Sequence, residues 1–170
     1  MRILTIDPGP KESAFCLLEG YKPILFDKCG NEALLSEILG PYQRLNEIDA
    51  AAIEMVASYG MAVGAEVFET CVWIGRFTQA INIASGIVPD RVFRMEEKQR
   101  LCHDSRARDS NIRQALIDRF AGHDKKNGKG TKNNPDWFYG FRADEWAAYA
   151  VGVVWLDRQQ EAILKDRRTS

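Results

Sequence analysis

The sequence predicts a single α/β domain built on a five-stranded mixed sheet flanked by helices. Three apolar segments follow one another between residues 2 and 29 with only tight turns between them, and two later apolar segments alternate with helical patterns. Strands joined by tight turns form an antiparallel meander, whereas strands separated by a helix can pair in parallel. A chain of 170 residues is long enough to bury one sizeable core.

The first strand delivers an acid to its end. Ile3–Gly9 (ILTIDPG) is rich in strand formers up to Asp7. Pro8 disfavours helical angles at the residue before it, and Pro-Gly suits the centre of a tight turn. Asp7 is therefore predicted at the carboxyl edge of the sheet, where α/β proteins place their chemistry. The other two strands of the meander are expected at Ser13–Glu19 and Lys22–Cys29.

The remaining elements alternate helix and strand. Asn31 can cap a helix that runs to about Leu45, and the next strand, Ile48–Met55, again carries an acid near its end, Glu54. A long helix is predicted for Ala65–Ser85, with an apolar face broad enough to pack on the sheet and also to serve a dimer. The later elements expected are a strand at Val88–Met95, a short helix at Glu96–Leu101, a helix within Ser105–Phe120 and a closing helix from Asp144 to about Asp166.

Residues 122–140 interrupt this pattern. The composition between His123 and Pro135 is rich in Lys, Asn and Gly and cannot form a core. Loops of this length without secondary structure are usually functional or disordered. We therefore expect one domain spanning residues 1–170, with a basic flexible loop at about 122–140.

Charge is distributed unevenly along the chain. The net charge is −1, yet residues 91–142 hold 13 Lys/Arg against 7 Asp/Glu, whereas residues 1–90 hold 6 against 12. A basic segment inside an otherwise acidic protein is typical of a polyanion-binding face, although a solvated charged surface has the same composition.

The sequence indicates a protein of a reducing compartment. No apolar run is long enough to span a membrane, and we expect no signal peptide. The four cysteines lack CxxC spacing and lie in apolar surroundings, which indicates reduced core thiols in the cytoplasm. A zinc site using Cys102, His103 and His123 is an alternative for one of them.

Three acids from separate elements are expected to converge. The ends of the first and fourth strands bring Asp7 and Glu54 side by side, and the closing helix can bring Asp144 to the same edge. Carboxylates that converge without basic partners repel one another, and divalent cations with a preference for oxygen ligands, Mg²⁺ or Mn²⁺, relieve that repulsion. Taken singly, Asp7 could cap its own turn, and Asp144 or Glu145 could be a helix N-terminal acid. The joint arrangement is what indicates a metal site.

Three segments resemble the motifs of one family. Ile3–Gly9 (ILTIDPG), Ala52–Glu54 (AIE) and Ala143–Ala150 (ADEWAAYA) are similar to the first strand, the second catalytic strand and the start of the final helix of RuvC-like Holliday junction resolvases, in the RNase H-like superfamily. The resemblance covers most of the chain. It looks closest to the phage and prophage branch through Gly64–Phe77, Lys98–Phe120 and Lys129–Pro135.

The resemblance implies an RNase H-like fold, a homodimer, and metal-dependent paired nicking of four-way DNA junctions. Such an enzyme would act in DNA recombination, DNA repair or phage DNA processing, in the cytoplasm of a bacterial or phage-infected cell. The catalytic and metal-binding candidates are Asp7, Glu54 and Asp144, with Glu145 as a further metal ligand; the metal implied is Mg²⁺, for which Mn²⁺ can substitute. Many relatives carry an acid or histidine where this chain has Phe141; Asp136 or Glu145 could take its place, or the site could use three ligands.

In this interpretation basic residues hold the DNA backbone while a metal-activated water attacks a junction phosphate. The DNA-binding candidates are Lys98, Arg106, Arg108, Lys125, Lys126, Lys129 and Lys132. Tyr59 and Met61, shortly after the second acidic strand, are candidates for probing the junction core.

Other functions compete with this one. The same chain could be a branched-DNA-binding protein that has lost cleavage, or a nuclease for other branched nucleic acids. An actin-like or sugar-kinase-like phosphotransferase also ends its first strand in Asp and glycine, but Pro10–Glu12 lacks the small residues that cradle phosphates.

Overall fold

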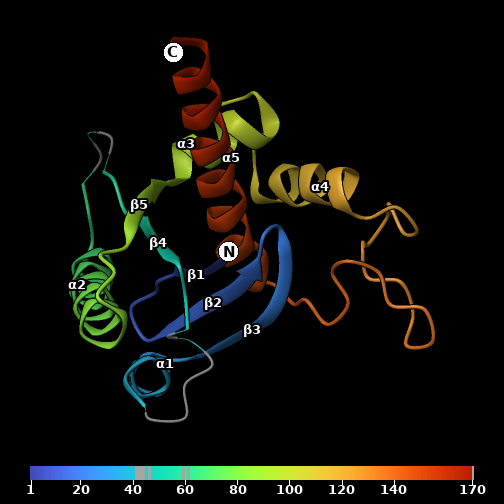
Figure 1. The fold of residues 1–170 in the computed structure, drawn as a ribbon. Coiled ribbons are helices and arrows are strands. Elements are labelled where there is room, and N and C mark those ends of the chain that lie inside the picture. Colours follow the sequence, from blue (N-terminus) through green and yellow to red (C-terminus); the bar gives the residue numbers. More distant parts are fainter. Residues whose placement is uncertain (41–44, 46, 59, 61, 170) are drawn as a thin grey trace.

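The computed structural model describes residues 1–40, 45, 47–58, 60 and 62–169, which contain five strands in one sheet and five helices (Figure 1). The strands are β1 (Arg2–Asp7), β2 (Glu12–Glu19), β3 (Lys22–Gly30), β4 (Ala50–Met55) and β5 (Asp90–Phe93). The helices are α1 (Asn31–Leu39), α2 (Ala65–Ser85), α3 (Arg94–Cys102), α4 (Asp109–Phe120) and α5 (Glu145–Thr169).

The sheet has the predicted mixed topology, in the order β3-β2-β1-β4-β5. β1, β2 and β3 pair antiparallel, which confirms the meander. β4 pairs parallel with β1, and β5 pairs parallel with β4. The parallel pairing places the carboxyl ends of β1 and β4 at the same edge of the sheet, as the sequence predicts.

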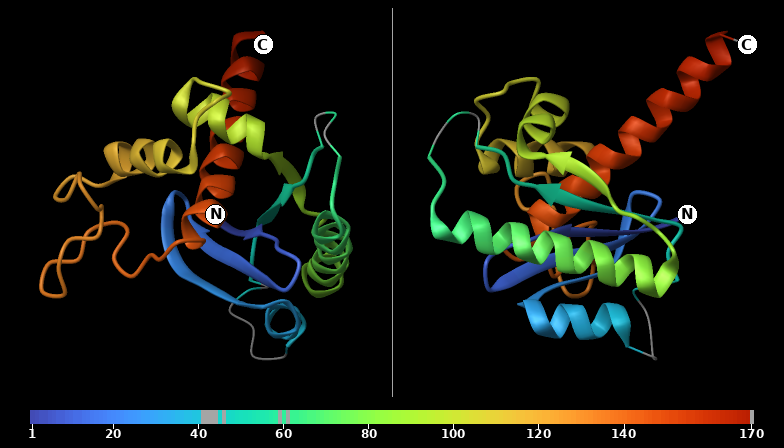
Figure 2. Two further views of the ribbon diagram at one scale, coloured as in Figure 1. Left: turned by 180° about the vertical axis from the view of Figure 1, so that it is seen from behind. Right: turned by 90° about the vertical axis from the view of Figure 1, so that its left-hand side faces the viewer.

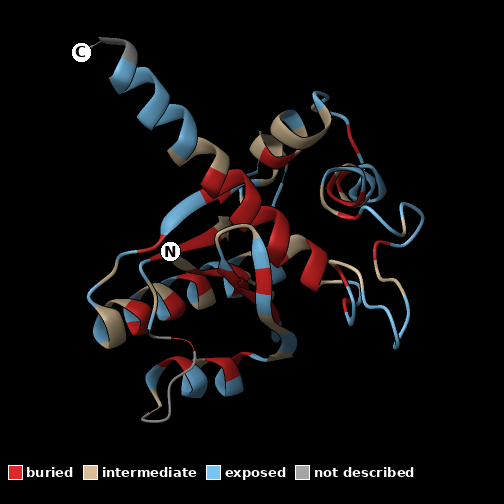
Figure 3. Ribbon diagram, turned by 45° about the vertical axis from the view of Figure 1, so that its right-hand side comes forward, coloured by how far each residue is buried: buried red, intermediate tan, exposed pale blue. Residues whose placement is uncertain are grey.

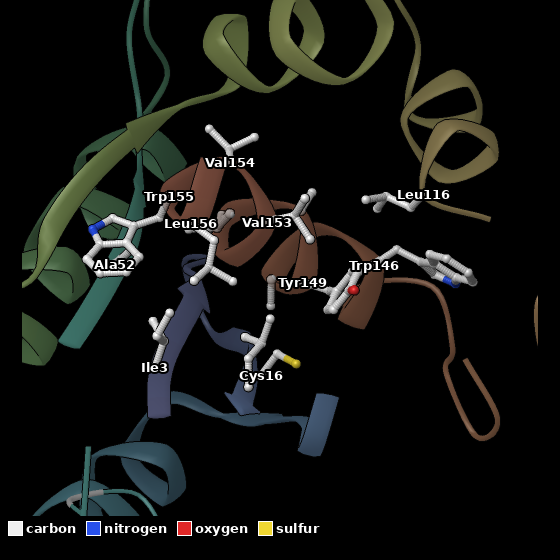
Figure 4. Packing of buried hydrophobic residues seen from close by; sticks show 14 of the residues in the cluster. Ile3, Cys16, Ala52, Leu116, Trp146, Tyr149, Val153, Val154, Trp155 and Leu156 are labelled. Atoms are coloured by element: carbon white, nitrogen blue, oxygen red, sulfur yellow. The ribbon is translucent and has the colours of Figure 1, made fainter. Parts of the chain in front are cut away.

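Helices cover both faces of the sheet (Figure 2). Leu4 and Ile6 of β1 pack into a core with α1 and α2, whereas Ile3, one residue out of phase, belongs to a second core with α4 and α5. This alternation is the two-residue period of a strand buried on both faces. Figure 4 shows Tyr149 and Leu156 of α5 facing the side chains of the sheet in the second core.

Helix α5 is held very close to β1 and β2. A Cβ atom on Gly152 would lie 2.8 Å from Leu18 Cδ1, so a larger residue at this position would have to displace the fully buried Leu18 side chain. The hydroxyl of Thr5 donates a hydrogen bond of 2.7 Å to the carbonyl oxygen of Ala148. Farther along, residues 160–167 are exposed, and this end of the helix projects from the body of the protein (Figures 2 and 3).

Helix α1 is shorter than the sequence predicts. It ends at Leu39 instead of continuing to about Leu45, and Gly40 has extended backbone angles. Gly40 precedes Pro41 in the sequence, and the residue before a proline is disfavoured in the helical region. The Gly-Pro pair therefore outweighs the apolar spacing that predicts a longer helix.

Helix α2 buries only part of its apolar surface. Ile74, Phe77 and Ile81 are buried against the sheet, but Phe68 and Val72 are 61% and 57% exposed. Cys71 is also exposed, so the prediction that all four cysteines are core residues is wrong for this one. The outer face of α2, defined here by Phe68 and Val72, is therefore apolar and uncovered in the single chain.

Residues 122–140 contain no helix or strand, but they are tied together by hydrogen bonds. The carboxylate of Asp124 accepts from the backbone N–H groups of Lys126, Asn127 and Gly130. Phe138, at the end of the stretch, is fully buried in the core. Among the helices of the described ranges, none combines the length and apolar character that a membrane span requires.

Candidate functional site

The sheet register places charged side chains in one row. Ile6 pairs with Ile53, so Asp7 and Glu54 follow at the adjacent ends of β1 and β4. Asp7 also pairs with Ala14, and Ala14 pairs with Lys28 of β3. Residues opposite one another across strands point to the same face. Because Ala14 belongs to the core under α5, Asp7, Glu54 and Lys28 all point to the face that α5 covers.

A cleft of about 610 Å³ opens at this edge of the sheet. Its walls come from the ends of β1 and β4 and from the starts of α3, α4 and α5, which meet on one side of the sheet (Figure 1). The charged residues that line it are Asp7, Glu54, Arg94, Asp109, Arg113 and Asp144. The structure thus brings the three acids predicted from sequence into one cleft.

Asp7 and Glu54 form a tightly coupled acid pair. Burial, followed by the negative charge of Glu54, raises the pKa of Asp7 to about 8. Burial, followed by the charge of Glu97, raises the pKa of Glu54 to about 7. A hydrogen bond between the two carboxyl groups raises the pKa of Asp7 and lowers that of Glu54, as expected when Asp7 holds the proton. Without a cation, the pair therefore retains a proton near neutral pH.

Arg94 is a basic residue of the cleft that the sequence did not predict. The sequence predicted that the β5 strand runs to Met95, but the strand ends at Phe93 and Arg94 begins α3. The Arg94 guanidinium donates hydrogen bonds of 2.5 Å to Glu97 Oε2 and to Asp109 Oδ1. Its charge lowers the pKa values of Asp7 and Glu54, against the larger effect of burial.

Glu97 lies fully buried behind this arginine. Its Oε2 atom is paired with Arg94, but among the described residues its Oε1 atom has no hydrogen-bond partner. Burial raises the pKa of Glu97, and the Arg94 guanidinium opposes that rise. A charged side chain is rarely buried completely unless paired, so a fully buried acid on α3 was not predictable from sequence.

Asp144 reaches the cleft from the N-terminal end of α5, but its carboxylate has a basic partner. Lys28 Nζ lies 2.6 Å from Asp144 Oδ2 and 3.2 Å from Glu12 Oε2. These contacts, with Asp144 first, raise the pKa of Lys28. The premise that the acids converge without basic partners is therefore wrong for this structure: Lys28 and Arg94 supply positive charge at either side.

Phe141 and the two residues suggested as substitutes for the acid missing there, Asp136 and Glu145, all have other contacts. Phe141 is fully buried, with its ring centroid 4.3 Å from that of Phe26. Asp136 accepts hydrogen bonds from the backbone N–H groups of His123 and Asp124, inside the 122–140 loop. Glu145 is buried, and its Oε2 accepts from the backbone N–H of Arg142 at the start of α5. The cleft lining includes none of the three.

The predicted DNA-binding residues lie on the second half of the chain. Lys98 is in α3, and Arg106 and Arg108 are exposed in the segment that leads to α4. The exposed or half-buried lysines of the 122–140 loop are Lys125, Lys126, Lys129 and Lys132. Arg113, which is not among the predicted DNA-binding residues, lines the cleft with its guanidinium carbon 4.8 Å from the Trp146 ring centroid. Tyr59 and Met61 lie outside the described residues.

The donor set fits a divalent cation only in part. Within the described residues no group of three His, Cys, Asp or Glu side chains is assembled closely enough to hold a metal ion. The predicted alternative, zinc held by Cys102, His103 and His123, is accordingly not assembled. The chemistry of Asp7 and Glu54 nevertheless fits Mg²⁺, because two half-buried carboxyl groups that share a proton offer the oxygen donors this ion prefers. Asp144 lines the same cleft and could add a third.

Comparison with known proteins identifies the fold. No protein-family model matches the sequence, and the search of curated proteins finds no match. Among solved structures, Thermus thermophilus RuvC has a TM-score of 0.64 at 16% identity, over 91% of this chain and 92% of that chain. T. thermophilus RuvC in complex with a Holliday junction substrate has a TM-score of 0.64 at 14% identity, with the same coverage. The fowlpox virus Holliday junction resolvase has a TM-score of 0.51 at 16% identity, over 93% of this chain and 99% of that chain. The chain therefore has the RNase H-like fold of these proteins, as the sequence predicts.

Proposed function

We propose that this protein is a structure-specific DNA endonuclease that resolves four-way junctions by two-metal-ion phosphodiester hydrolysis. The observation that carries the proposal is the coupled pair of Asp7 and Glu54 at adjacent strand ends, in a cleft that Asp144 also lines. The fold shared with RuvC, solved with a Holliday junction substrate, supports the choice of substrate. The assignment to the phage and prophage branch rests on the sequence resemblance alone.

The acids and arginines of the cleft would have distinct roles. Mg²⁺ held by Asp7, Glu54 and Asp144 would supply an activated water and would neutralise charge that develops on the phosphate. Arg94 favours the ionised forms of Asp7 and Glu54, which are the forms that bind cations. Arg113 presents a guanidinium to the cleft, where it can bind phosphate oxygens.

Cleavage of a synthetic four-way junction tests the proposal. With Mg²⁺, the unchanged protein should make paired nicks in opposite strands, and EDTA should abolish them. Asp7→Asn should abolish cleavage while junction binding survives or tightens, because it removes a metal ligand and a negative charge near the DNA. Glu37→Gln, at an exposed position of α1, is the matched control and should cut normally. Cleavage by Asp7→Asn would mean that Asp7 is not a ligand.

A second candidate function is junction binding without cleavage. Two observations favour it: Asp144 is paired with Lys28, and Phe141 fills the place of an acid with a buried ring. Tight junction binding by the unchanged protein, without nicks in either Mg²⁺ or Mn²⁺, would select this function. Cleavage of forks, flaps or RNA–DNA hybrids in preference to four-way junctions would instead select a nuclease for other branched nucleic acid.

The basic loop is proposed to hold the DNA backbone. Lys125, Lys126 and Lys129 are candidate phosphate contacts in the 122–140 loop. If all three bind phosphates, changing them together to Ala should reduce the slope of log affinity against log salt by about 2.7, since each contact contributes about 0.9. The control is Lys22→Ala at the far end of β3. An unchanged affinity and slope would exclude the loop from the DNA-binding surface.

A homodimer is proposed because a four-way junction is two-fold symmetric and needs one site for each of two matching strands. The exposed Phe68 and Val72 on the outer face of α2 give such a dimer an apolar surface. Changing both to Glu should convert the dimer to a monomer in sedimentation experiments and should uncouple the paired nicks. A dimer that survives this double change must use another surface.

A further inference from the structure

Lys28 occupies a position that connects the cleft to the edge of the sheet. It lies on β3 in the same cross-strand row as Asp7, two strands away, and points to the same face. Its ammonium group binds Asp144 Oδ2 at 2.6 Å and Glu12 Oε2 at 3.2 Å. Lys28 therefore forms ion pairs with two carboxylates, and one of them, Asp144, lines the cleft.

This ion pair is of a kind that is easily exchanged. The side chains of Lys28, Asp144 and Glu12 are 39%, 44% and 59% exposed, so water competes with each contact. Exposed ion pairs contribute little to stability, which means that they break at little cost. If Asp144 leaves, Lys28 still has Glu12 as a neighbour, and its side chain remains partly exposed to solvent next to the Asp144 side of the cleft.

We propose that Lys28 is a positioning residue that exchanges Asp144 for DNA. This inference rests on the proposed function. In the metal-free protein Lys28 holds the Asp144 carboxylate; when a divalent cation is bound at Asp7 and Glu54, Asp144 turns to the cation and the released ammonium group binds a phosphate oxygen of the DNA backbone. Lys28 thereby couples metal binding to DNA binding, and the coupling acts equally in both directions.

If this exchange occurs, loss of Lys28 should strengthen metal binding and weaken DNA binding. Without Lys28, Asp144 loses the ion-pair partner that it has among the described residues, so the metal should bind more tightly. The DNA, in contrast, should lose one phosphate contact, but only when metal is present. A lysine that merely fastens the start of α5 to β3 would give another result: its loss would loosen Asp144 and weaken metal binding.

The test uses the full chain with Lys28→Met, and with Lys28→Arg as the variant that retains the charge. Lys22→Met, at the other end of β3 and paired in register with Glu19, is the matched control. Calorimetric titration with Mn²⁺ should show about two- to fivefold tighter binding for Lys28→Met, the range expected for release from an exposed ion pair. Lys28→Arg and Lys22→Met should bind Mn²⁺ as the unchanged protein does.

Junction binding is measured in parallel by fluorescence anisotropy over a salt series, once in EDTA and once in Ca²⁺. In EDTA, Lys28→Met should bind like the unchanged protein. In Ca²⁺ its affinity should fall and its salt slope should decrease by about 0.9, which corresponds to one phosphate contact.

Each failure has its own meaning. If the unchanged protein binds no Mn²⁺, the proposed function fails and the exchange with it. If the unchanged protein binds Mn²⁺ but Lys28→Met binds it equally well or more weakly, the exchange alone is overturned. An equal loss of DNA affinity in EDTA and in Ca²⁺ would also overturn it, because Lys28 would then contact DNA without leaving Asp144.

Discussion

Replacing Asp7 by Asn should stabilise the metal-free protein at alkaline pH, although it removes a residue of the proposed active site. Asp7 has a pKa of about 8 in the folded protein against an ordinary value of 3.8. Between these values the folded state holds a proton that the unfolded state has lost. The free energy of unfolding therefore falls as pH rises through this range. The stabilisation that comes from the proton on Asp7 is lost completely only above pH 8.

The size of the effect follows from that shift. Each pH unit inside the window costs about 1.4 kcal/mol, so the cost of keeping Asp7 grows by about 3 kcal/mol between pH 5.5 and pH 8. Asn carries no charge and does not titrate. For a chain of this length, the difference corresponds to roughly 6 to 12 °C in melting temperature.

Thermal and urea unfolding in EDTA at pH 5.5, 7 and 8.5 measure this directly. The stability advantage of Asp7→Asn over the unchanged protein should increase with pH, while Glu37→Gln should show no such trend. If the advantage is absent at pH 8.5, or does not change with pH, then Asp7 is not held protonated by burial and Glu54, and the electrostatic account of the cleft is wrong.

Two further predictions concern the acid pair and the buried Phe141. At low Mg²⁺ concentration the cleavage rate should rise between pH 6 and 8.5, because Asp7 and Glu54, with pKa values of about 8 and 7, must lose their protons to bind cations. A higher Mg²⁺ concentration should shift this rise to lower pH. A pH–rate profile that does not depend on the Mg²⁺ concentration would contradict the prediction. Phe141→Asp should not restore a fourth ligand but should destabilise the protein by about 4 kcal/mol in urea unfolding, because the ring is fully buried, whereas Phe141→Leu should cost much less.

The fold was predictable because local signals agree with one another. Apolar segments separated by tight turns gave the meander, and the helix before β4 gave the parallel pairing that brings the ends of β1 and β4 together. From that topology alone, Asp7 and Glu54 are neighbours. The part of the site that lies at the strand ends, Asp7 and Glu54, was therefore predictable from the sequence.

The ionic partners were not predictable in the same way. Lys28 and Asp144 lie 116 positions apart in sequence, and their contact depends on the path of α5 over the sheet. Arg94 enters the cleft only because β5 is short and a helix starts there. Neither Lys28 nor Arg94 has a local sequence pattern that distinguishes it from an ordinary surface charge. The acids of the site were therefore predictable from the sequence, but their basic partners were not.

The close contact between Gly152 and Leu18 lies in the apolar core, yet it determines how far Asp144 lies from Asp7. Gly152 rests against Leu18, and Asp144 lies about 12 Å away along the helix axis at a rise of about 1.5 Å per residue. A side chain at position 152 would have to displace Leu18, and a bulky one would shift α5 and move Asp144 relative to Asp7. A screen for loss of cleavage should therefore recover substitutions of Gly152, which have no charge and no contact with DNA, together with substitutions of the acids themselves.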